Sequence, residues 1–394
     1  MSATPPPASQ PITVFFVANV EWHFTWQSCQ TIARGLAERG FVVHYLNPLP
    51  KRLPGIREVG RMAARLTGRP QLAGQTRNPL PSGVTLWNPL CMPATGPVTR
   101  RIAHLMLLPL IRRLQRIRQK AGRCVVITAL PFCLPHQVAL SLRPDLLLYL
   151  CRTHWAADPR APKRELCEER VLSDADLVLP DSDLLYERCR DHPGVRRLPA
   201  MVDLDRFHEV PSSAPGGRGP GGRLRCTYYG GISWRLDLPL LGEISRRHQL
   251  RLIGPIRTDL DMLAPETEIV GTVRHEALQQ HLEETDVLLL PYARHEFVLG
   301  IMPAKLFEYL ATGLPIVATD ALPTLQEYAS LIHIASDTNE FLEAIEEAPH
   351  EDPGLRGARL ALAQEHSVAR WMDCIARWIK EALAANPDLE TSGD

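Results

Sequence analysis

The stretch DVLLLPYARHEFVLGIMPAKLFEYLATGLPIVATD, residues 286–320, constrains the fold of this chain most. Its apolar runs at 287–290 and 316–319 are long enough for strands and too short to be helices on their own. Pro303 suits the start of a helix between them, and Gly313, followed closely by a proline, suits its end. The stretch therefore predicts a βαβ unit, and such units bind ligands at the carboxyl ends of their parallel strands.

Two charged side chains lie at the start of the expected helix. Lys305 falls in its first turn, and Glu308 follows one turn later as the only acid between residues 303 and 315. A helix N-terminus favours anions, and Lys305 adds a full positive charge there. A carboxylate close by can accept two hydrogen bonds from a vicinal diol, so the pair predicts a site for a diphosphate and a ribose. The alternative is an ordinary i, i+3 surface pair.

The segment PAKLFEYLATGLPIVAT resembles the donor-binding signature of GT-B glycosyltransferases of the retaining, family-4-like type, the glycosyl transferases group 1. The resemblance implies that Glu308 holds the nucleotide ribose and that the donor also contacts Pro303, Lys305 and Leu306. Many members of the family carry a second glutamate eight positions before the first. Gly300 stands at that position here, and Glu296, four residues upstream, is the candidate replacement.

A second set of donor contacts is expected near the middle of the chain. A strand over 225–229 runs into Gly230 and Gly231, whose missing side chains allow the backbone to approach a phosphate. The segments Y-x-G-x-I, R-L-D-L and L-I-G-P that follow resemble the same family. The resemblance implies that Arg235 contacts the diphosphate, and that Gly254 and Pro255 lie beside the base.

The N-terminal part begins with a Rossmann-like pattern. Strands are expected at 12–17 and 41–46, with a helix from about Trp26 to Arg39, but no G-x-G-x-x-G accompanies them, so no dinucleotide cofactor is predicted. The segment WHFTWQSCQTIARGLAERGFVVHYLNP resembles the opening of the teichuronic-acid-biosynthesis subgroup of the same glycosyltransferases. The resemblance implies that the loop residues Glu21, Trp22 and His23 line the cleft on the acceptor side. The alternative for Trp22 is core packing, which we also expect for Trp26.

A further strand is expected at 146–150, followed by Cys151-Arg152-Thr153-His154-Trp155. The subgroup usually carries acids in this loop, and they are missing here. Other retaining GT-B enzymes place a histidine after an N-domain strand against the donor sugar, which implies this role for His154. The alternative is a structural histidine. We expect Cys151 to be a buried residue at the strand end, and a nucleophilic role is the less favoured alternative.

Charge is unevenly spread over the 394 residues, although the net charge is zero. Residues 1–150 contain 18 Lys and Arg against 4 Asp and Glu, an excess of +14 that the remainder cancels. The excess is concentrated in 51–69 and 99–123, and it predicts an acidic or membrane-surface partner. Both segments lack interleaved aromatics, so no nucleic-acid partner is predicted.

The second basic segment has the pattern of an amphipathic helix. Its apolar positions near helical spacing are Ile102, Leu105, Met106, Leu110, Leu114 and Ile117, and arginines extend around the other side. A basic amphipathic helix is typical of membrane-surface binding. The alternative, compatible with the first, is a helix packed on the N-terminal sheet with a solvated basic face.

Other features narrow the class of protein. Apolar content of 45% and charged content of 22% are typical of a soluble globular protein. The nine cysteines form no C-x-x-C, so neither a zinc site nor thioredoxin-type chemistry is predicted, and reduced thiols are expected. The N-terminus lacks a signal-peptide pattern, and the longest apolar run, 102–111, is far below the roughly 20 residues of a spanning helix. We expect a cytoplasmic protein, peripheral at the inner face of the plasma membrane.

Together these features predict an α/β protein of the GT-B class, in which two Rossmann-like α/β/α domains face a cleft and the C-terminal helix crosses back to the N-domain. The expected divisions are a disordered 1–11, an acceptor-side domain at 12–208, a Gly/Pro linker at 209–223, a nucleotide-sugar-binding domain at 224–365, and a crossover helix and tail at 366–394.

The expected activity is transfer of a sugar from a nucleotide-sugar donor to a saccharide or lipid-linked acceptor, with retention. The catalytic candidates are His154, Glu21 and Lys305, and neither a metal nor a cofactor is expected. No carboxylate pair of the glycosidase type is identifiable. Two alternatives stay open: an inactive GT-B scaffold that binds without catalysis, and a nucleotide-sugar epimerase.

Overall fold

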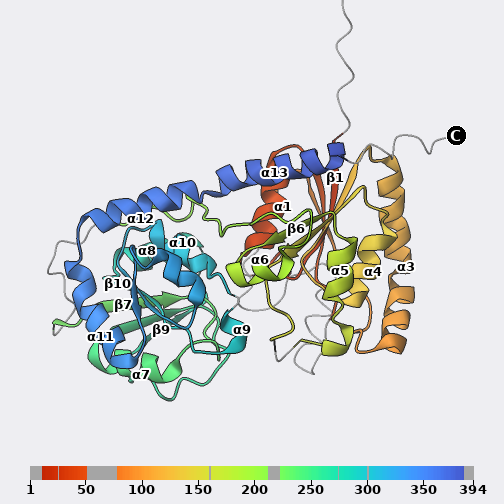
Figure 1. Ribbon diagram of the computed structural model, residues 1–394. Coiled ribbons are helices and arrows are strands. Elements are labelled where there is room, and N and C mark those ends of the chain that lie inside the picture. Colours follow the sequence, from red (N-terminus) through yellow and green to blue (C-terminus); the bar gives the residue numbers. More distant parts are fainter. Residues whose placement is uncertain are drawn as a thin grey trace, which may run out of the picture. The chain divides into compact units, whose positions relative to one another are not determined.

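The computed structural model describes residues 11–24, 26–50, 78–158, 161–211, 222–273, 275–299 and 301–385 (Figure 1). The predictions for 1–10, for the basic segment 51–69, for most of the linker and for Gly300 lie outside these residues. The chain divides into two compact units. Unit 1 comprises the chain up to Pro180, Tyr186–Arg197 and the residues from Met372 onward; unit 2 comprises Asp181–Leu185 and Leu198–Trp371.

Unit 1 is built on six parallel strands in the order β3-β2-β1-β4-β5-β6. Their bounds are β1 Thr13–Val17, β2 Val42–Leu46, β3 Val84–Trp87, β4 Cys124–Thr128, β5 Leu146–Cys151 and β6 Leu177–Pro180. The inner strands are buried almost throughout, as a parallel sheet covered on both faces requires. The edge strand β3 was not predicted, because only one of its four residues is buried and its apolar pattern is therefore weak.

The helices of this sheet are α1 Ser28–Glu38, α3 Pro97–Lys120, α4 Cys133–Ser141, α5 Glu168–Asp174 and α6 Asp183–Cys189. Helices α3 and α4 contribute to one core cluster with Phe15 and Val17 of β1 and with Cys124 and Val126 of β4. They therefore cover the same face of the sheet, with α3 on the outer flank of the unit (Figure 1).

Helix α3 confirms the predicted amphipathic helix but corrects its buried face. The buried residues are Ala103, Leu107, Ile111 and Leu114. Ile102, Leu105 and Met106, which the sequence suggested as part of the apolar face, point to solvent. The helix carries two apolar stripes, and only packing on the sheet decides which one is buried. Within the described residues, no helix is long and apolar enough to cross a membrane.

Unit 2 also has six parallel strands, in the order β12-β11-β10-β7-β8-β9. Their bounds are β7 Arg225–Tyr229, β8 Gln249–Ile253, β9 Glu268–Gly271, β10 Val287–Leu290, β11 Ile316–Thr319 and β12 His333–Ala335. The helices are α7 Leu238–Arg247, α8 His275–Glu283, α9 Glu296–Leu299, α10 Ala304–Leu310, α11 Thr338–Glu347 and α12 Gly354–Glu365. The predicted βαβ unit is confirmed as β10, α10 and β11.

The last helix, α13 Val368–Ala385, begins in unit 2 and continues in unit 1 from Met372. It packs closely on α1, since a Cβ on Gly35 would lie 2.5 Å from Cγ of Met372. The Arg39 Nε atom donates to Oδ1 of Asp373 at 2.7 Å. The predicted return of the C-terminal helix to the N-terminal domain is therefore confirmed.

Each sheet has one point at which the strand order reverses. In unit 1 this topological switch point lies between β1 and β4, and in unit 2 it lies between β7 and β10. Open parallel sheets bind ligands beyond the carboxyl ends of the strands at such points. Ligand sites are therefore expected at the loops after β1 and β4 in unit 1, and at those after β7 and β10 in unit 2.

Candidate functional site

At the switch point of unit 2, three segments meet with almost no side-chain material between them. Gly230 follows β7 with φ +136°, and a Cβ there would lie 2.0 Å from Cε of Lys305. Gly254 follows β8 with φ +138°, and a Cβ there would lie 2.0 Å from the carbonyl oxygen of Gly230. Glycine is therefore required at both positions. Gly231 differs, because it is exposed and a Cβ there would meet nothing within 4 Å.

Lys305 supplies the fixed charge of this corner. It is the second residue of α10, whose N-cap is Pro303, one position earlier in the helix than the sequence suggested. Because α10 has only seven residues, its dipole is weaker than that of a long helix, and the ammonium charge dominates. Its Nζ atom lies 5.8 Å from the ring centroid of Tyr228. Burial disfavours the ammonium, but the Tyr228 and Tyr292 hydroxyls and Glu308 outweigh it and raise the pKa of Lys305.

Glu308 lies one turn further along α10, where the hydroxyl of Tyr229 donates to its Oε2 atom at 2.6 Å. Within the described part of the chain, its Oε1 atom accepts no hydrogen bond, so lone pairs are left for a ligand. Burial raises the pKa of Glu308, while the Tyr229 hydrogen bond, Lys305 and Arg206 oppose the rise and Asp203 adds to it.

The arrangement argues against an ordinary i, i+3 surface pair. Among the described residues, Lys305 and Glu308 form no ion pair with each other, and each side chain faces a different tyrosine. Tyr309, the residue after Glu308, ties the helix to β10, because its hydroxyl donates to the carbonyl of Leu289 at 3.2 Å. The cation and the carboxylate are therefore held separately on the first two turns of α10.

Three further predicted donor residues lie around this corner. Arg235 is exposed, and its guanidinium lies 4.7 Å from the ring centroid of Phe297 in α9. The carbonyl of Pro255 accepts from the amide of Ile232 at 3.1 Å, which joins the segments after β7 and β8. Leu306 is fully buried and anchors α10 in the core of unit 2. Glu296, the candidate replacement for the missing second glutamate, is exposed in the first turn of α9.

At the switch point of unit 1, the loop after β1 is held by several hydrogen bonds. The Trp22 amide donates to Asn47 Oδ1 at 2.9 Å, and Asn78 Nδ2 donates to the Trp22 carbonyl at 2.7 Å. The Tyr45 hydroxyl donates to the Val20 carbonyl at 2.8 Å. A substrate contact in this loop would therefore lie on a well-supported backbone.

The side chain of Trp22 corrects an expectation. It is fully buried and packs edge-on against Tyr45, with ring centroids 5.0 Å apart. Trp22 is therefore a core residue. Its ring has no exposed surface with which to contact an acceptor directly. Glu21 and His23, on either side of it, are half-buried, so contact with a substrate stays a prediction for these two residues.

His154 follows β5, as expected, and is half-buried. Arg188 lies with Nη1 3.1 Å from His154 Nε2 and with Nη2 3.2 Å from Glu168 Oε2. Because a guanidinium can only donate, it makes Nε2 an acceptor and leaves the imidazole proton on Nδ1. Contact of His154 with a donor sugar stays a prediction. Cys151 is buried, as expected, and the hydrogen bond with the Cys189 thiol, followed by burial, raises its pKa, which disfavours a thiolate nucleophile.

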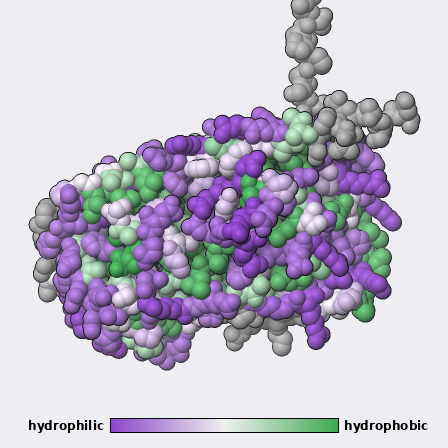
Figure 2. All heavy atoms as spheres, viewed as in Figure 1, coloured by the Kyte–Doolittle hydropathy of each residue, from purple (hydrophilic) through white to green (hydrophobic). Residues whose placement is uncertain are grey.

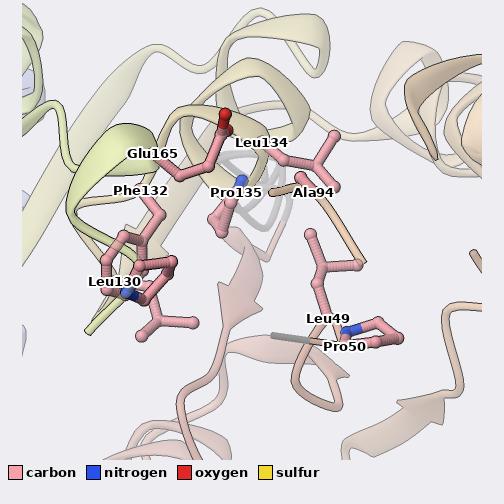
Figure 3. Close-up of a pocket in the computed structure, with 9 residues that line it drawn as sticks. Leu49, Pro50, Ala94, Leu130, Phe132, Leu134, Pro135 and Glu165 are labelled. Atoms are coloured by element: carbon pink, nitrogen blue, oxygen red, sulfur yellow. The ribbon is translucent and has the colours of Figure 1, made fainter. Parts of the chain in front are cut away.

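Unit 1 also contains a small cavity of about 20 Å³, lined by residues of several segments that point toward one another (Figure 3). Leu49, Leu130 and Leu134 give it apolar walls, and Glu165 contributes its one acidic group. The volume suffices for about one water molecule, whereas ligand sites usually measure about 300–1,000 Å³. The cavity is therefore a packing defect and not a sugar site.

Comparison with known proteins agrees with this geometry. Residues 223–349, which include the corner formed by β7 and α10, match the family model of glycosyl transferases group 1. TuaH of Bacillus subtilis (strain 168) is 24% identical over 203 residues. Its description as a teichuronic acid biosynthesis glycosyltransferase is itself an inference. That alignment covers 45% of this chain and 51% of the relative, so it spans about half the length of each.

Solved structures match nearly the whole chain in fold. Sucrose-phosphate synthase from Thermosynechococcus elongatus superposes with a TM-score of 0.68 at 18% identity, covering 95% of this chain and 100% of that one. HepE of Anabaena, solved in complex with UDP, has a TM-score of 0.63 at 11% identity, covering 94% and 100%. WaaG, a glycosyltransferase involved in lipopolysaccharide biosynthesis, has a TM-score of 0.53 at 14% identity, covering 97% and 100%.

The architecture is therefore that of the GT-B class, with two parallel six-stranded sheets flanked by helices. The resemblance to the glycosyl transferases group 1 is confirmed, and residues 223–349 carry the domain of that family.

The two tyrosines that flank the charged groups of this site were not predicted from the sequence. Tyr229 donates to Glu308, and Tyr228 lies beside Lys305. Their position directly before Gly230 and Gly231 was the available signal, but a tyrosine at a strand end is more often a core residue. Only the packing of β7 against α10 shows which groups they face.

Proposed function

We propose that this protein transfers a sugar from a nucleotide-sugar donor to an acceptor hydroxyl with retention. One observation carries the proposal: at the switch point of unit 2, a fixed cation, a carboxylate with free lone pairs and a backbone without side chains meet at one place. These are the groups that a diphosphate and a ribose require. The family match over residues 223–349 supports the same assignment.

In this proposal the diphosphate lies against Lys305, Arg235 and the backbone of Gly230 and Gly231, while Glu308 accepts hydrogen bonds from the ribose hydroxyls. During transfer the bond between the anomeric carbon and the diphosphate oxygen breaks, and its electrons remain on the leaving diphosphate. Lys305 and Arg235 stabilise that charge electrostatically. The raised pKa of Lys305 keeps the ammonium protonated throughout the neutral range.

The acceptor side is assigned to unit 1. We propose that the acceptor is a saccharide, carried on a lipid or on a precursor of a cell-surface polysaccharide, and that Glu21, His23 and His154 contact the reacting sugars. TuaH and WaaG carry names from cell-envelope biosynthesis, which supports this class of acceptor. We further propose that transfer proceeds without a metal at the cytoplasmic face of the membrane; full activity in EDTA is the expected result, and loss restored by Mg²⁺ or Mn²⁺ would contradict it.

Thermal-shift measurements with UDP-, GDP- and dTDP-sugars test the donor site. We expect one nucleotide class to raise the melting temperature, and HepE, solved with UDP and with UDP-glucose, makes the uridine nucleotides the first to try. Glu308→Ala should abolish the shift. Glu343→Ala is the matched control, because Glu343 is an exposed acid on α11 of the same unit. An unchanged shift in Glu308→Ala would overturn the ribose assignment.

Product analysis then separates transfer from the two other uses of such a site. The donor is incubated alone and with a lipid extract, and the sugar is followed by mass spectrometry and NMR. Transfer to the extract with the donor's anomeric configuration kept supports the proposal. Binding without turnover on any extract would indicate an inactive scaffold, and an isomerised sugar from donor alone would indicate an epimerase.

A further inference from the structure

The outer face of α3 changes character along its length. Val98, Ile102, Leu105, Pro109, Arg112 and Arg116 follow one another at spacings of four and three, so they form a single stripe along the helix. The first four are apolar and the last two are arginines. At 3.6 residues per turn, the apolar half from Val98 to Pro109 extends for about three turns, and the basic half from Arg112 to Arg116 for about one.

The apolar half of this stripe is open to solvent. Val98 is 70% exposed, Leu105 62% and Ile102 44%, and Met106 beside them is 47% exposed. On the neighbouring helix α4, Leu140 is 43% exposed. An open depression of about 650 Å³ lies between the two helices, with Leu105 and Leu140 in its wall. Figure 2 shows hydrophobic side chains on the flank where α3 runs.

No acidic side chain of the described residues neutralises the basic half. Helix α3 has no acidic residue of its own. Two of its cations face inward and are paired, Arg100 with Glu165 at 3.2 Å and Arg118 with Asp145 at 2.7 Å. In the described ranges, the outward cations Arg112 and Arg116 have no acidic partner.

These two groups of arginines have different functions. Arg100 and Arg118 fix the two ends of the helix to other segments of unit 1, through acids that are nearly buried. Arg112 and Arg116 are exposed and play no part in that anchoring. The exposed row of aliphatic side chains leaves hydrocarbon in water without contributing to the fold, and exposed apolar patches of this kind mark interaction sites.

We propose that the outer face of α3 is a docking surface for an anionic lipid bilayer, on which the helix lies parallel to the membrane plane. The apolar half enters the boundary between headgroups and acyl chains, and Arg112 and Arg116 contact lipid phosphates. The inference concerns unit 1 alone, and it does not depend on donor binding in unit 2.

The chemistry of the stripe favours a bilayer over other partners. A membrane interface offers hydrocarbon and anionic phosphate along one flat surface, and a straight helix face that is first aliphatic and then cationic matches both. The exposed face of α3 has no aromatic side chain for base stacking, so single-stranded nucleic acid is disfavoured. A second copy of this chain is a poorer partner. If two α3 helices packed antiparallel, the arginines of each helix would lie against the apolar half of the other and would remain unpaired.

Sedimentation of the full chain with vesicles tests the inference. Vesicles of phosphatidylcholine alone are compared with vesicles that contain 30% phosphatidylglycerol as the anionic lipid. We expect binding only to the anionic vesicles, weakening as salt is raised. Arg112→Gln/Arg116→Gln should bind about 30-fold more weakly with a shallower salt dependence, since each arginine near an anionic surface contributes about 1 kcal/mol. Leu105→Ser/Met106→Ser should bind roughly 10- to 100-fold more weakly with the salt dependence unchanged.

Matched substitutions elsewhere serve as controls. Met262→Ser/Ile269→Ser changes two apolar residues of similar exposure in unit 2, and Arg377→Gln changes an exposed arginine of α13. Both should bind like the parent chain. Melting temperature and nucleotide-induced shift should be unchanged in all variants, which separates a failure of this inference from a failure of the donor site.

Three results would overturn the inference. The first is no sedimentation of the parent chain with anionic vesicles. The second is equal sedimentation of the α3 variants and the parent, which would assign binding to another surface. The third is a dimer by light scattering that the same variants dissociate while vesicle binding stays absent, which would assign the face to a second copy of the chain.

Discussion

The hydrogen bond from Tyr229 to Glu308 allows a sharp test of the donor site. Tyr229→Phe removes the hydroxyl and leaves the ring, which stacks on Phe207 with centroids 6.0 Å apart. A hydrogen bond of 2.6 Å to a carboxylate contributes about 1.5–3 kcal/mol. Each step of about 1.4 kcal/mol corresponds to a tenfold change in Kd. If the hydrogen bond positions Glu308 for the ribose, removing the hydroxyl should therefore weaken nucleotide binding by about 10- to 100-fold.

The pH dependence distinguishes positioning from simple loss of stability. Ribose recognition uses the carboxylate, so affinity should fall as the pH is lowered through the pKa of Glu308, which burial raises above its ordinary value of 4.5. The Tyr229 hydrogen bond lowers that pKa, as do Lys305 and Arg206, while Asp203 raises it. Tyr229→Phe should therefore move the midpoint of nucleotide binding to higher pH.

The same shift makes a prediction for stability. Because the pKa of Glu308 is higher in the folded chain than in the unfolded chain, ionisation costs folding free energy as the pH rises through the folded pKa. Glu308→Gln cannot ionise. It should be more stable than the parent above the folded pKa and equal to it below the unfolded value, while it loses nucleotide binding at every pH.

Isothermal titration calorimetry between pH 5 and 8 measures the affinities, and thermal melting over the same range measures stability. Tyr186→Phe is the control, because Tyr186 is a half-buried tyrosine on α6 that contacts Arg197 and is remote in sequence from the site. The reasoning is refuted if Tyr229→Phe binds the nucleotide as the parent does, with the same pH midpoint, while Glu308→Gln has lost binding. A lower melting temperature with unchanged affinity would give Tyr229 a structural role only.

Further predictions concern the packing of the site and the catalytic candidates. Gly230→Ala should abolish nucleotide binding and lower the melting temperature, because a Cβ would lie 2.0 Å from Cε of Lys305 at a φ of +136°; Gly231→Ala, which meets nothing within 4 Å, should preserve both. Trp22→Ala should reduce the free energy of unfolding by about 3–5 kcal/mol in denaturant titrations, since its ring is fully buried, with nucleotide affinity unchanged. His154→Ala should lower kcat in product-formation assays at unchanged donor affinity, and an effect confined to KM would contradict its catalytic role.

Local features of the sequence were enough to predict most of the strands and helices around the site. The strands β10 and β11 begin and end where their apolar runs do, because short apolar runs next to a proline leave few alternatives. Lys305 and Glu308 could be placed on successive turns of one helix, since residues three apart face the same side. Such features depend on neighbours within a few residues, and a linear pattern contains that information.

Contacts between distant segments decided the rest. Tyr229 and Glu308 are 79 residues apart, and their hydrogen bond exists only because β7 and β10 are neighbours in the sheet. Helix α3 has two apolar stripes of similar quality, and the sheet buries one and leaves the other to solvent. Trp22 is buried for the same reason, under a segment that returns from more than 50 residues away. Periodicity predicts that a helix has an apolar face, but which side chains are covered depends on the free energy of packing against surfaces that the local sequence does not contain.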